Sequence, residues 1–596
     1  MPAHDYEITH PRLKRVLDIA LVLGGGLTLG MFCLVLGFPL TDERRELVWL
    51  ATRSILGLFV LQEALRFLIV RRRLALLRAR RVEVILASVS ALEIIWGDAI
   101  VLWLHRLGSD LAAATITLLY LGGAQLTFLT SLALRAMRDN RWLNGRSYSP
   151  GMVFTLSFAL LILVGTLLLK TPHATQHGIS WIDALFVATS AVCVTGLSPV
   201  DISAVFTQHG LWVLLGLIQV GGLGIMTLTY SFAYFTAGGV SLRNRIGLQD
   251  LLSEENLSHV STVLAVIIVF TLGVELTGAV LIHAALSGTA HAPDNLPFFA
   301  LFHSVSAFCN AGFSTLSSGL ADARVQGERG FLSVIMLLIV LGGLGFPVIK
   351  NFWEFASGAV RRRLGLRLAT PPRLTANSRI VLVTTTALLA GGTLALWLTE
   401  FAFGRQAGAV AAQSTWFTAL FHSVTARTAG FNVTPVESLL PASAALMMFL
   451  MFVGGSPSST AGGIKTSTLA LAFLSLRRVL LGRRDIEAFG RRLSDELANR
   501  ALATLLVAVG FITTVAVVLC TLHPELPPED LVFEAVSAVG TVGLSRALTP
   551  QLGDSAKLVL IVAMLVGRVG VLTFLLSFIT RRQPTGLRLP ETNVVL

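Results

Sequence analysis

The stretch SAVCVTGLS at residues 190–198 contains the feature that decides the fold, a glycine signature that occurs four times in the chain. The other copies are SAFCNAGFS at 306–314, TARTAGFN at 425–432 and SAVGTVGLS at 537–545. Their glycines, Gly196, Gly312, Gly430 and Gly543, are spaced by 116, 118 and 113 residues. So regular a spacing indicates one supersecondary unit in four copies, and four copies around an axis can enclose a pore.

Composition places the chain in the membrane. Apolar residues make up 54% of it, charged residues only 13%, and the mean hydropathy is +0.75, whereas soluble domains carry roughly 25% charged residues. The four cysteines, two of which (Cys193 and Cys309) precede repeated glycines, cannot form a disulfide framework. The first residues, MPAHDYEITHPRLKR, lead into an apolar span without a small-residue cleavage site, so we expect an uncleaved anchor.

The apolar segments predict an all-α integral membrane protein with four parallel helix–pore loop–helix repeats around one central pore. About 20 apolar residues cross a bilayer. Candidate spans at 16–38, 47–70, 82–104 and 111–134 predict about four extra N-terminal helices before the repeats. The paired spans of the repeats are 152–169 and 211–235, 263–283 and 332–352, 380–401 and 443–476, and 501–522 and 558–578.

Between the two spans of each repeat lies an apolar half-span that ends in the glycine signature. WIDALFVATSAV and WFTALFHSVTA, for example, have about a dozen residues, which is too short to cross a bilayer. We therefore expect re-entrant segments, which are tolerated only where they are buried in protein or line a watery cavity. The predicted organisation is an N-terminal membrane extension at 1–147 and repeats at 148–256, 257–370, 371–495 and 496–596, the last with a C-terminal tail.

Basic residues cluster before, between and after the repeats, near 71–81, 135–146, 361–363, 477–492 and 581–582. Because Lys and Arg concentrate on the cytoplasmic side of membrane proteins, both termini and all inter-repeat loops are predicted to be cytoplasmic. The repeats are then parallel, and the glycine signatures open outward. The same rule explains the net charge of +12 by contact with membrane lipid, and no nucleic-acid motif is present.

The repeated glycine suggests a selectivity filter, because backbone carbonyls that replace an ion's water shell require an extended, strained strand that glycine tolerates. The last copy begins like the potassium filter TVGYG. The C-terminal end of each preceding half-helix, which carries negative partial charge, also favours a cation. The alternative is that the glycines only permit tight helix packing. The predicted lining is Val194, Thr195, Gly196 and Leu197; Asn310, Ala311, Gly312 and Phe313; Thr428, Ala429, Gly430 and Phe431; and Thr541, Val542, Gly543 and Leu544.

Two features predict a constriction beneath this filter. The third inner helix is interrupted by GGSPSSTAGG at 454–463, which cannot hold a regular helix. Arg568 is centred in the apolar run LVLIVAMLVGRVGVLTFLLSF, and a charge at that depth should face the interior, where carbonyls of the interrupted segment are its expected partners. The alternatives are a kinked packed helix and a purely structural arginine.

The four signatures, together with GGSPSSTAGGIKT and GRVGVLTF, resemble the Trk/Ktr/HKT superfamily of potassium transporters, and its bacterial Ktr branch more than its plant branch. The resemblance covers about 150–580. It implies that the four loops form a potassium filter, that a glycine at position 196 goes with potassium rather than sodium preference, and that Arg568 helps an intramembrane loop to close the pore. The gate residues implied are Gly454, Gly455, Ser456, Ser458, Ser459, Thr460, Gly462, Gly463 and Arg568.

The resemblance also implies a homodimer and a separate cytoplasmic ring of nucleotide-binding regulatory subunits, with K⁺ as the transported ion and Na⁺ as a possible activator or co-ion. The chain has no GxxxxGK[ST] loop, and no convergent catalytic groups predict an enzyme. A sodium-coupled or sodium-permeable secondary transporter is the alternative function. His303, His422 and Glu534 occupy matching half-span positions, where they could satisfy local backbone or bind the ion; Glu275 and Glu400 are read as structural partners.

Overall fold

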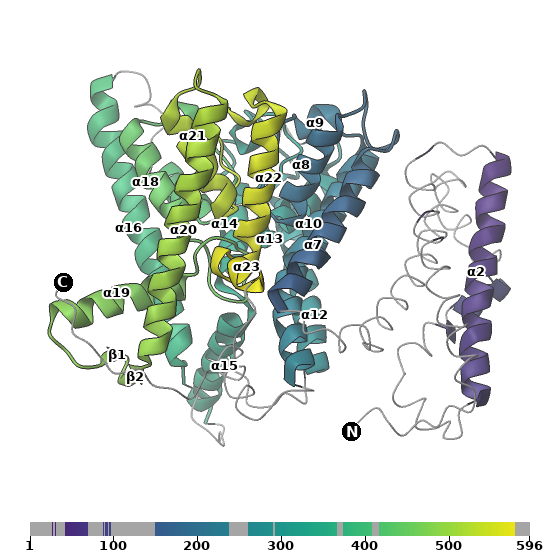
Figure 1. The fold of residues 1–596 in the computed structure, drawn as a ribbon, viewed down its shortest axis with the longest axis horizontal. Coiled ribbons are helices and arrows are strands. Elements are labelled where there is room, and N and C mark those ends of the chain that lie inside the picture. Colours follow the sequence, from purple (N-terminus) through teal and green to yellow (C-terminus); the bar gives the residue numbers. More distant parts are fainter. Residues whose placement is uncertain are drawn as a thin grey trace. The chain divides into compact units, whose positions relative to one another are not determined.

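The computed structural model describes residues 42–69, 150–237, 260–289, 293–365, 373–407 and 416–578, with scattered residues at 27–38 and 87–96. The described chain is mostly helical, as the composition predicts (Figure 1). It divides into two compact units, which we describe separately. Unit 1 comprises 1–147, 167–180 and 205–213, and unit 2 comprises 148–166, 181–204 and 214–596.

Unit 1 contains the helix α2 (Asp42–Ile69), which corresponds to the predicted span 47–70. Its residues Ile55, Leu56 and Phe59 are buried together with Ala87. The other three predicted N-terminal spans lie wholly or largely outside the described residues, as do both termini. Their number and orientation therefore stay predictions.

Beyond residue 150 the same order of elements occurs four times: a long helix, a short apolar helix, a glycine signature and a further helix (Figure 1). The first set is α7 (Pro150–Leu169), α8 (Trp181–Val192), α9 (Ile202–Val205) and α10 (Gln208–Ala237). The second is α12 (Val260–Leu286), α13 (Leu296–Cys309), α14 (Arg329–Leu344) and α15 (Phe346–Arg363). The third is α16 (Ala376–Ala407), α17 (Trp416–Thr425), α18 (Pro441–Phe452) and α19 (Thr466–Leu480). The fourth is α20 (Asp495–Leu522), α21 (Pro528–Gly540), α22 (Asp554–Val569) and α23 (Val571–Phe578).

The short helices α8, α13, α17 and α21 form the centre of unit 2. One phenylalanine on each of them is fully buried, at 0% exposure: Phe186, Phe302, Phe421 and Phe533. Three neighbouring pairs of sets are linked in the same way, because α14 contacts α17, α18 contacts α21, and α22 contacts α8. Each of these contacts joins the inner helix of one set to the short helix of the next.

The inner helix of each set is the one that follows the glycine signature. It is continuous in the first set, as α10, and broken in the other three, as α14–α15, α18–α19 and α22–α23. The predicted spans 332–352 and 558–578 were expected to be continuous, and this was wrong: α14 and α15 bend by 102° and α22 and α23 by 93°. The breaks fall at Gly345 and Gly570, which have φ of 79° and 90°. A side chain rarely adopts such φ values, and Pro347 favours a fresh helix start after the first break. The third inner helix is interrupted at 453–465, as predicted.

Within the described residues, three helices are long and apolar enough to cross a membrane by themselves, and each bent pair could supply one further span. The three are Val266–Leu286 in α12, Ala376–Glu400 in α16 and Asp495–Leu522 in α20. Between their ends, most of their outward side chains are apolar; on α20, for example, Leu506 is 74% exposed and Val509 52%. Lipid is the solvent that suits such a surface.

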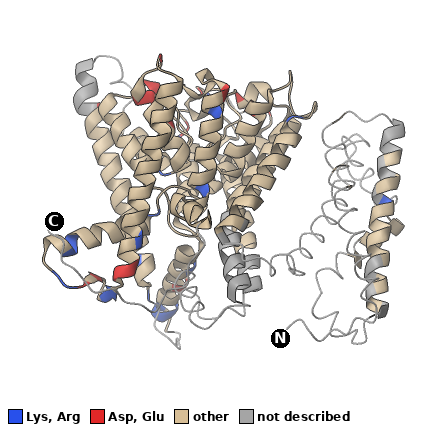
Figure 2. Ribbon diagram, in the orientation of Figure 1, with Lys and Arg blue, Asp and Glu red and all other residues tan. Residues whose placement is uncertain are grey.

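A short hairpin that the sequence analysis did not predict joins α19 to α20. Strands β1 (Ile486–Ala488) and β2 (Arg491–Leu493) pair antiparallel around Phe489 and Gly490, whose positive φ values form the turn. The basic residues of this hairpin, of α19 and of α15 gather at one end of unit 2 (Figure 2). This is the distribution that the positive-inside rule requires.

Candidate functional site

The four glycine signatures meet in a closed ring. A Cβ atom built on any of the four glycines would collide with the backbone of the next signature, so only glycine permits this approach. Such an added Cβ atom would lie 2.5 Å from the Ala311 carbonyl oxygen at Gly196, 2.7 Å from that of Ala429 at Gly312 and 2.5 Å from that of Val542 at Gly430, and at Gly543 it would collide with the carbonyl oxygen of Thr195. The fourth contact returns to the first signature and closes the ring.

The backbone conformation of each signature is also repeated. The residue two positions before the glycine has positive φ, and so does the glycine: Val194 (54°) and Gly196 (98°), Asn310 (60°) and Gly312 (69°), Thr428 (71°) and Gly430 (78°), Thr541 (49°) and Gly543 (95°). At Asn310 and Thr541 the backbone is left-handed, with ψ of 44° and 53°, so the expected extended strand does not include these first lining residues. Positive φ in a β-branched residue is strained by about 1–3 kcal/mol, and such strain gathers at functional sites.

The positive φ of the residue two positions before each glycine has a local cause: this residue belongs to the cap that ends the preceding half-helix. After α8, the amide of Thr195 donates to the Ser190 carbonyl (2.7 Å) and that of Val194 donates to the Ala191 carbonyl (3.1 Å). This is the Schellman pair of bonds, in which glycine usually occupies the left-handed position. Equivalent bonds end α13 and α21. The third signature is one residue shorter, and there Ala429 and Gly430 both donate to the Thr425 carbonyl.

One hydroxyl per half-helix fastens each signature from behind. In the first and fourth copies, the Gly196 and Gly543 amides donate to Ser190 Oγ (3.0 Å) and Ser537 Oγ (3.1 Å). In the other two, the hydroxyl donates instead to the carbonyl after the glycine: Ser306 to Phe313 (2.8 Å) and Thr425 to Phe431 (2.7 Å). These contacts explain the shared Ser/Thr-Ala flank, which helix packing would not require.

The polar residues at matching half-helix positions bind hydroxyl groups beyond the glycines. His303 Nε2 lies 3.0 Å from Ser314 Oγ, and His422 Nε2 lies 2.8 Å from Thr434 Oγ1. Glu534 Oε1 accepts from Thr549 Oγ1 at 2.8 Å and from the Ser545 hydroxyl. The geometry favours the local structural role over direct ion binding. Among the described residues, no group of three His, Cys, Asp or Glu could hold a metal ion.

Glu275 and Glu400 have the structural contacts that were expected of them. Cys309 Sγ donates to Glu275 Oε1 at 3.6 Å, and the Leu440 amide, at the start of α18, donates to Glu400 Oε1 at 3.4 Å. Both carboxylates are buried within unit 2; Glu275 contacts the second signature through Cys309, and Glu400 contacts the start of α18.

The interrupted segment, residues 453–465, lies against the backbone of the other sets. At its neck, Gly454 donates to the Ile464 carbonyl (2.9 Å) and Ile464 donates to the Phe452 carbonyl (3.3 Å). Ser456 donates through its amide to the Gly343 carbonyl of α14 (2.9 Å). At the tip, Thr460 Oγ1 donates to the Phe308 carbonyl of α13 (2.9 Å), and a Cβ on Gly462 would collide with Thr541. The segment therefore lies directly beneath the second and fourth signatures.

Arg568 binds this segment, as predicted, but from a different position in its helix. It lies in the last turn of α22, just before the break at Gly570, and not in the middle of a continuous spanning helix. Nη1 donates to the Thr460 carbonyl (2.6 Å) and Nη2 to the Gly221 carbonyl of α10 (3.2 Å). The second bond, to the first set, was not predicted.

The sequence did not lead us to predict a role for a second buried arginine, Arg427. Arg427 immediately precedes Thr428, the first predicted lining residue of the third signature, and its Nη2 donates to the Gly454 carbonyl at the neck of the segment (3.0 Å). The equivalent positions in the other signatures hold Cys193, Cys309 and Gly540, so an alignment of the four copies could have identified it.

Lys465 completes a group of three cations beneath the ring. Its Nζ donates to the Ala461 carbonyl at 2.7 Å. Within the part of the chain that the structure describes, no carboxylate forms an ion pair with Arg427, Lys465 or Arg568. Charges without counter-ions at membrane depth are expensive, and they mark a functional pathway.

Comparison with known proteins finds a family model, similar transport proteins and a similar solved structure. The family model of TrkH, described as a cation transport protein, matches residues 125–585. The Ktr system potassium uptake protein B of Bacillus subtilis is 33% identical over 75% of this chain and 96% of its own length. The potassium/sodium uptake protein NtpJ of Enterococcus hirae is 34% identical over 75% and 97%. The crystal structure of TrkH from Vibrio parahaemolyticus superposes with a TM-score of 0.58 at 20% identity, covering 76% of this chain and 91% of that one.

Proposed function

The chain belongs to the TrkH family of cation transport proteins, and from that premise we propose that it takes up potassium through the ring of four glycine signatures. The protein is a multi-pass membrane transport protein and not an enzyme. The observation that carries the proposal is the closed ring, in which each glycine touches the backbone of the next signature. Four equivalent backbone segments at one level supply the carbonyl groups that potassium coordination needs.

The lining of this filter is the set of sixteen residues at 194–197, 310–313, 428–431 and 541–544. The C-terminal ends of α8, α13, α17 and α21 lead into these segments, and their partial negative charge stabilises a cation at the ring. Glycine in all four copies favours potassium over sodium, because no side chain disturbs a quarter of the ring. The names of two similar proteins, which include potassium uptake, support this cargo.

The gate, in this proposal, is the segment 454–463 together with Arg568. The segment lies under the ring, and the guanidinium joins its tip to α10. A fixed positive charge below the filter also repels a cation that leaves it. Opening then requires the Thr460 carbonyl to leave Arg568.

The remaining features of the proposal concern the protein in its membrane. We place it in the cell membrane with both termini and the basic loops in the cytoplasm, and with the repeat boundaries at 148, 257, 371 and 496. It assembles as a homodimer on a separate cytoplasmic ring of nucleotide-binding regulatory subunits, which act near the basic end of unit 2 (Figure 2).

Rubidium uptake into vesicles tests the function. Full-length protein, reconstituted with its regulatory partner, should accumulate rubidium under a potassium diffusion potential without ATP, since about 2.3 kcal/mol per charge is available at 100 mV. Folded protein that accumulates no rubidium would contradict the proposal. Repeating the assay with and without sodium decides whether sodium is a co-ion, an activator or neither, and so tests the sodium-coupled alternative.

A further inference from the structure

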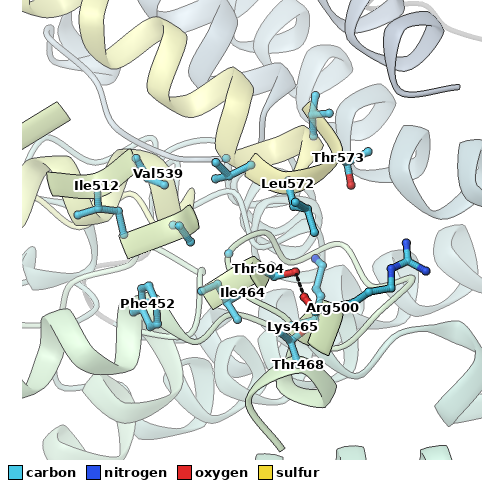
Figure 3. Close-up of a pocket in the computed structure, with 17 residues that line it drawn as sticks. Phe452, Ile464, Lys465, Thr468, Arg500, Thr504, Ile512, Val539, Leu572 and Thr573 are labelled. Carbon is cyan, nitrogen blue, oxygen red and sulfur yellow. Dashed lines mark hydrogen bonds between the residues drawn. The ribbon is translucent and has the colours of Figure 1, made fainter. Parts of the chain in front are cut away.

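A cavity of about 250 Å³ lies between the third and fourth sets of unit 2 (Figure 3). Its walls are the exit of the interrupted segment at Gly463–Lys465, the broken end of the fourth inner helix at 569–573, and the membrane-spanning helix α20. A further wall is formed by Val539 and Gly540, the last residues of α21, which lie within the fourth glycine signature. The cavity thus adjoins both elements of the proposed gate.

The wall contributed by α20 changes from charged to apolar along the helix. Arg500, Thr504, Ala508 and Ile512 recur every four residues and therefore share one helix face. They cover about 18 Å at 1.5 Å per residue. Arg500 lies one turn from the start of α20, at the basic end of unit 2, whereas Ile512 lies near the middle of the span. This gradient matches a lipid, whose charged group lies at the surface and whose chain points inward.

The charge of the lining selects the kind of lipid. Two cations, Lys465 and Arg500, line the cavity, and none of its lining residues is Asp or Glu. Thr468, Thr504 and Thr573 add hydroxyl groups, while Phe452, Ile464, Ile512, Val539 and Leu572 provide apolar surface (Figure 3). The volume is below the roughly 300–1,000 Å³ of ordinary small-molecule pockets, so the cavity can hold part of one chain and not two chains.

We propose that this cavity binds one acyl chain of an anionic membrane phospholipid, with its headgroup at Arg500, at the basic end of unit 2. The bound chain contacts Ile464 on one side and Leu572 on the other. It therefore stabilises one position of the interrupted segment relative to α22 and α23, and its occupancy sets how readily the segment moves. This regulatory step rests on the proposed function, whereas the binding itself does not.

Photo-crosslinking tests the binding without any flux measurement. Full-length protein in phosphatidylcholine vesicles receives phosphatidylglycerol with a diazirine at the chain end, and the labelled peptides are mapped by mass spectrometry. We expect adducts at 504–512 and 569–573 that Ala508→Phe reduces about fivefold, because Ala508 is buried in the cavity wall. Leu506→Phe on the exposed face of the same helix is the matched control and should keep them.

Two labelling results would overturn the binding proposal. One is equal labelling of the cavity by diazirine-tailed phosphatidylcholine, since the lysine and arginine would then select nothing. The other is no labelling of the cavity by phosphatidylglycerol while the exposed face at Leu506 is labelled. Displacement of the adducts by a free fatty acid, but not by unlabelled phosphatidylglycerol, would identify a different occupant and also contradict the proposal.

Rubidium flux in vesicles with and without phosphatidylglycerol tests the regulation. We expect the lipid to change wild-type flux about fivefold, at the low end of typical coupling between sites. Ala508→Phe and Arg500→Gln should remove this dependence, and Leu506→Phe should retain it. Positive crosslinking with lipid-independent flux would refute the regulation. A wild-type protein without flux in any vesicle would instead refute the proposed function. Lipid binding would still be decided by the crosslinking experiment alone.

Discussion

The glycine ring and the interrupted segment beneath it are built on opposite rules. The ring uses the same residue four times, and at each glycine the copy lies against the backbone of its neighbour. The segment occurs in one set only, and it is held by side chains that have no counterpart elsewhere, Arg427 and Arg568. Four equivalent backbone segments suit a site that surrounds an ion from four sides. A segment that occurs once must be held by residues that also occur once.

The inner helices show how that asymmetry arises. Each carries the same short pattern, VGGLG at 220–224, LGGLG at 341–345, VGGSP at 453–457 and VGRVG at 566–570. The first glycine lies against the end of its own half-helix in three sets: Gly221 at Val192, Gly342 at Phe308 and Gly567 at Val539. Arg568 occupies the second glycine position of the fourth pattern. One substitution in a repeated frame thus places a cation beneath the ring.

The largest effect is expected at the ring. A Cβ at Gly196 would lie 2.5 Å from the Ala311 carbonyl oxygen, on a residue with φ of 98°. Strain and collision together amount to about 3 kcal/mol, so Gly196→Ser should reduce potassium-over-sodium selectivity about a hundredfold. Competitive rubidium and sodium uptake measures it. Gly288→Ser is the control, because Gly288 has the same φ but open space around it; unchanged selectivity in Gly196→Ser would place the filter elsewhere.

The next effect concerns the anchor at the tip. Arg568→Ala removes a charge-assisted hydrogen bond to Thr460, worth about 1.5–3 kcal/mol, and should raise basal rubidium flux about tenfold or more. Deleting 457–460 should do the same, and the double change should add little, because the two groups act as one unit.

Lys557→Ala removes another cation of α22, one that binds Asp183 instead of the segment, and should leave flux near wild type. Additive increases in the double variant would show two separate barriers. A folded Arg568→Ala protein without transport would make the arginine structural, and the gating role would be withdrawn.

A smaller effect is expected at the neck. Arg427 makes one bond to Gly454, and two main-chain bonds already hold the neck closed. Arg427→Gln should therefore raise basal flux about threefold, less than the full value of one charge-assisted bond. Because Arg427 adjoins the filter residue Thr428, the rubidium-to-sodium ratio should also fall, which Arg568→Ala should not cause. Arg427→Lys should restore part of both properties, and a flux increase without any change in ion ratio would separate the neck from the filter.

The smallest effect lies outside both regions, in the loop between the second signature and α14. Arg324 Nε donates to Asp322 Oδ1 (2.9 Å), and this hydrogen bond lowers the pKa of the Asp322 carboxyl. The folded state then binds the proton more weakly than the unfolded state, in which the aspartate has a pKa of about 3.9. The contribution is present above that pH and is lost as the pH falls through the folded pKa.

For an exposed pair this contribution is about 0.2–1 kcal/mol. Thermal unfolding in detergent at pH 7 should show Asp322→Asn slightly destabilised, and the difference from wild type should shrink as the pH falls below about 3.9. A difference that stays constant over that fall in pH would contradict the assignment to charge. Ion selectivity should not change, because neither the ring nor the segment contacts this pair.

The sequence by itself determined the elements whose cause is local. Apolar length predicted the half-helix Trp181–Val192 with its observed bounds, and the Gly/Ser/Pro run predicted the interruption after Phe452. The four glycines identified the signatures, because a position that needs an unusual φ or a close backbone approach selects glycine, and this selection can be seen in a single residue. The sequence also placed Arg568 near the interrupted segment, since a buried charge must find carbonyl partners.

Only the tertiary structure decided how these elements meet. That Gly543 contacts Thr195 and closes the ring depends on residues 348 positions apart, and no local pattern encodes such a contact. The breaks at Gly345 and Gly570 arise where a helix that could have continued turns at a glycine with positive φ, whereas α10 runs unbroken through the same glycine pattern. Glycine permits a break without requiring one, so the surrounding packing selects it. The bond from Arg427 to Gly454 likewise exists because the third signature lies above its own interrupted helix, an arrangement that the packing of unit 2 decides.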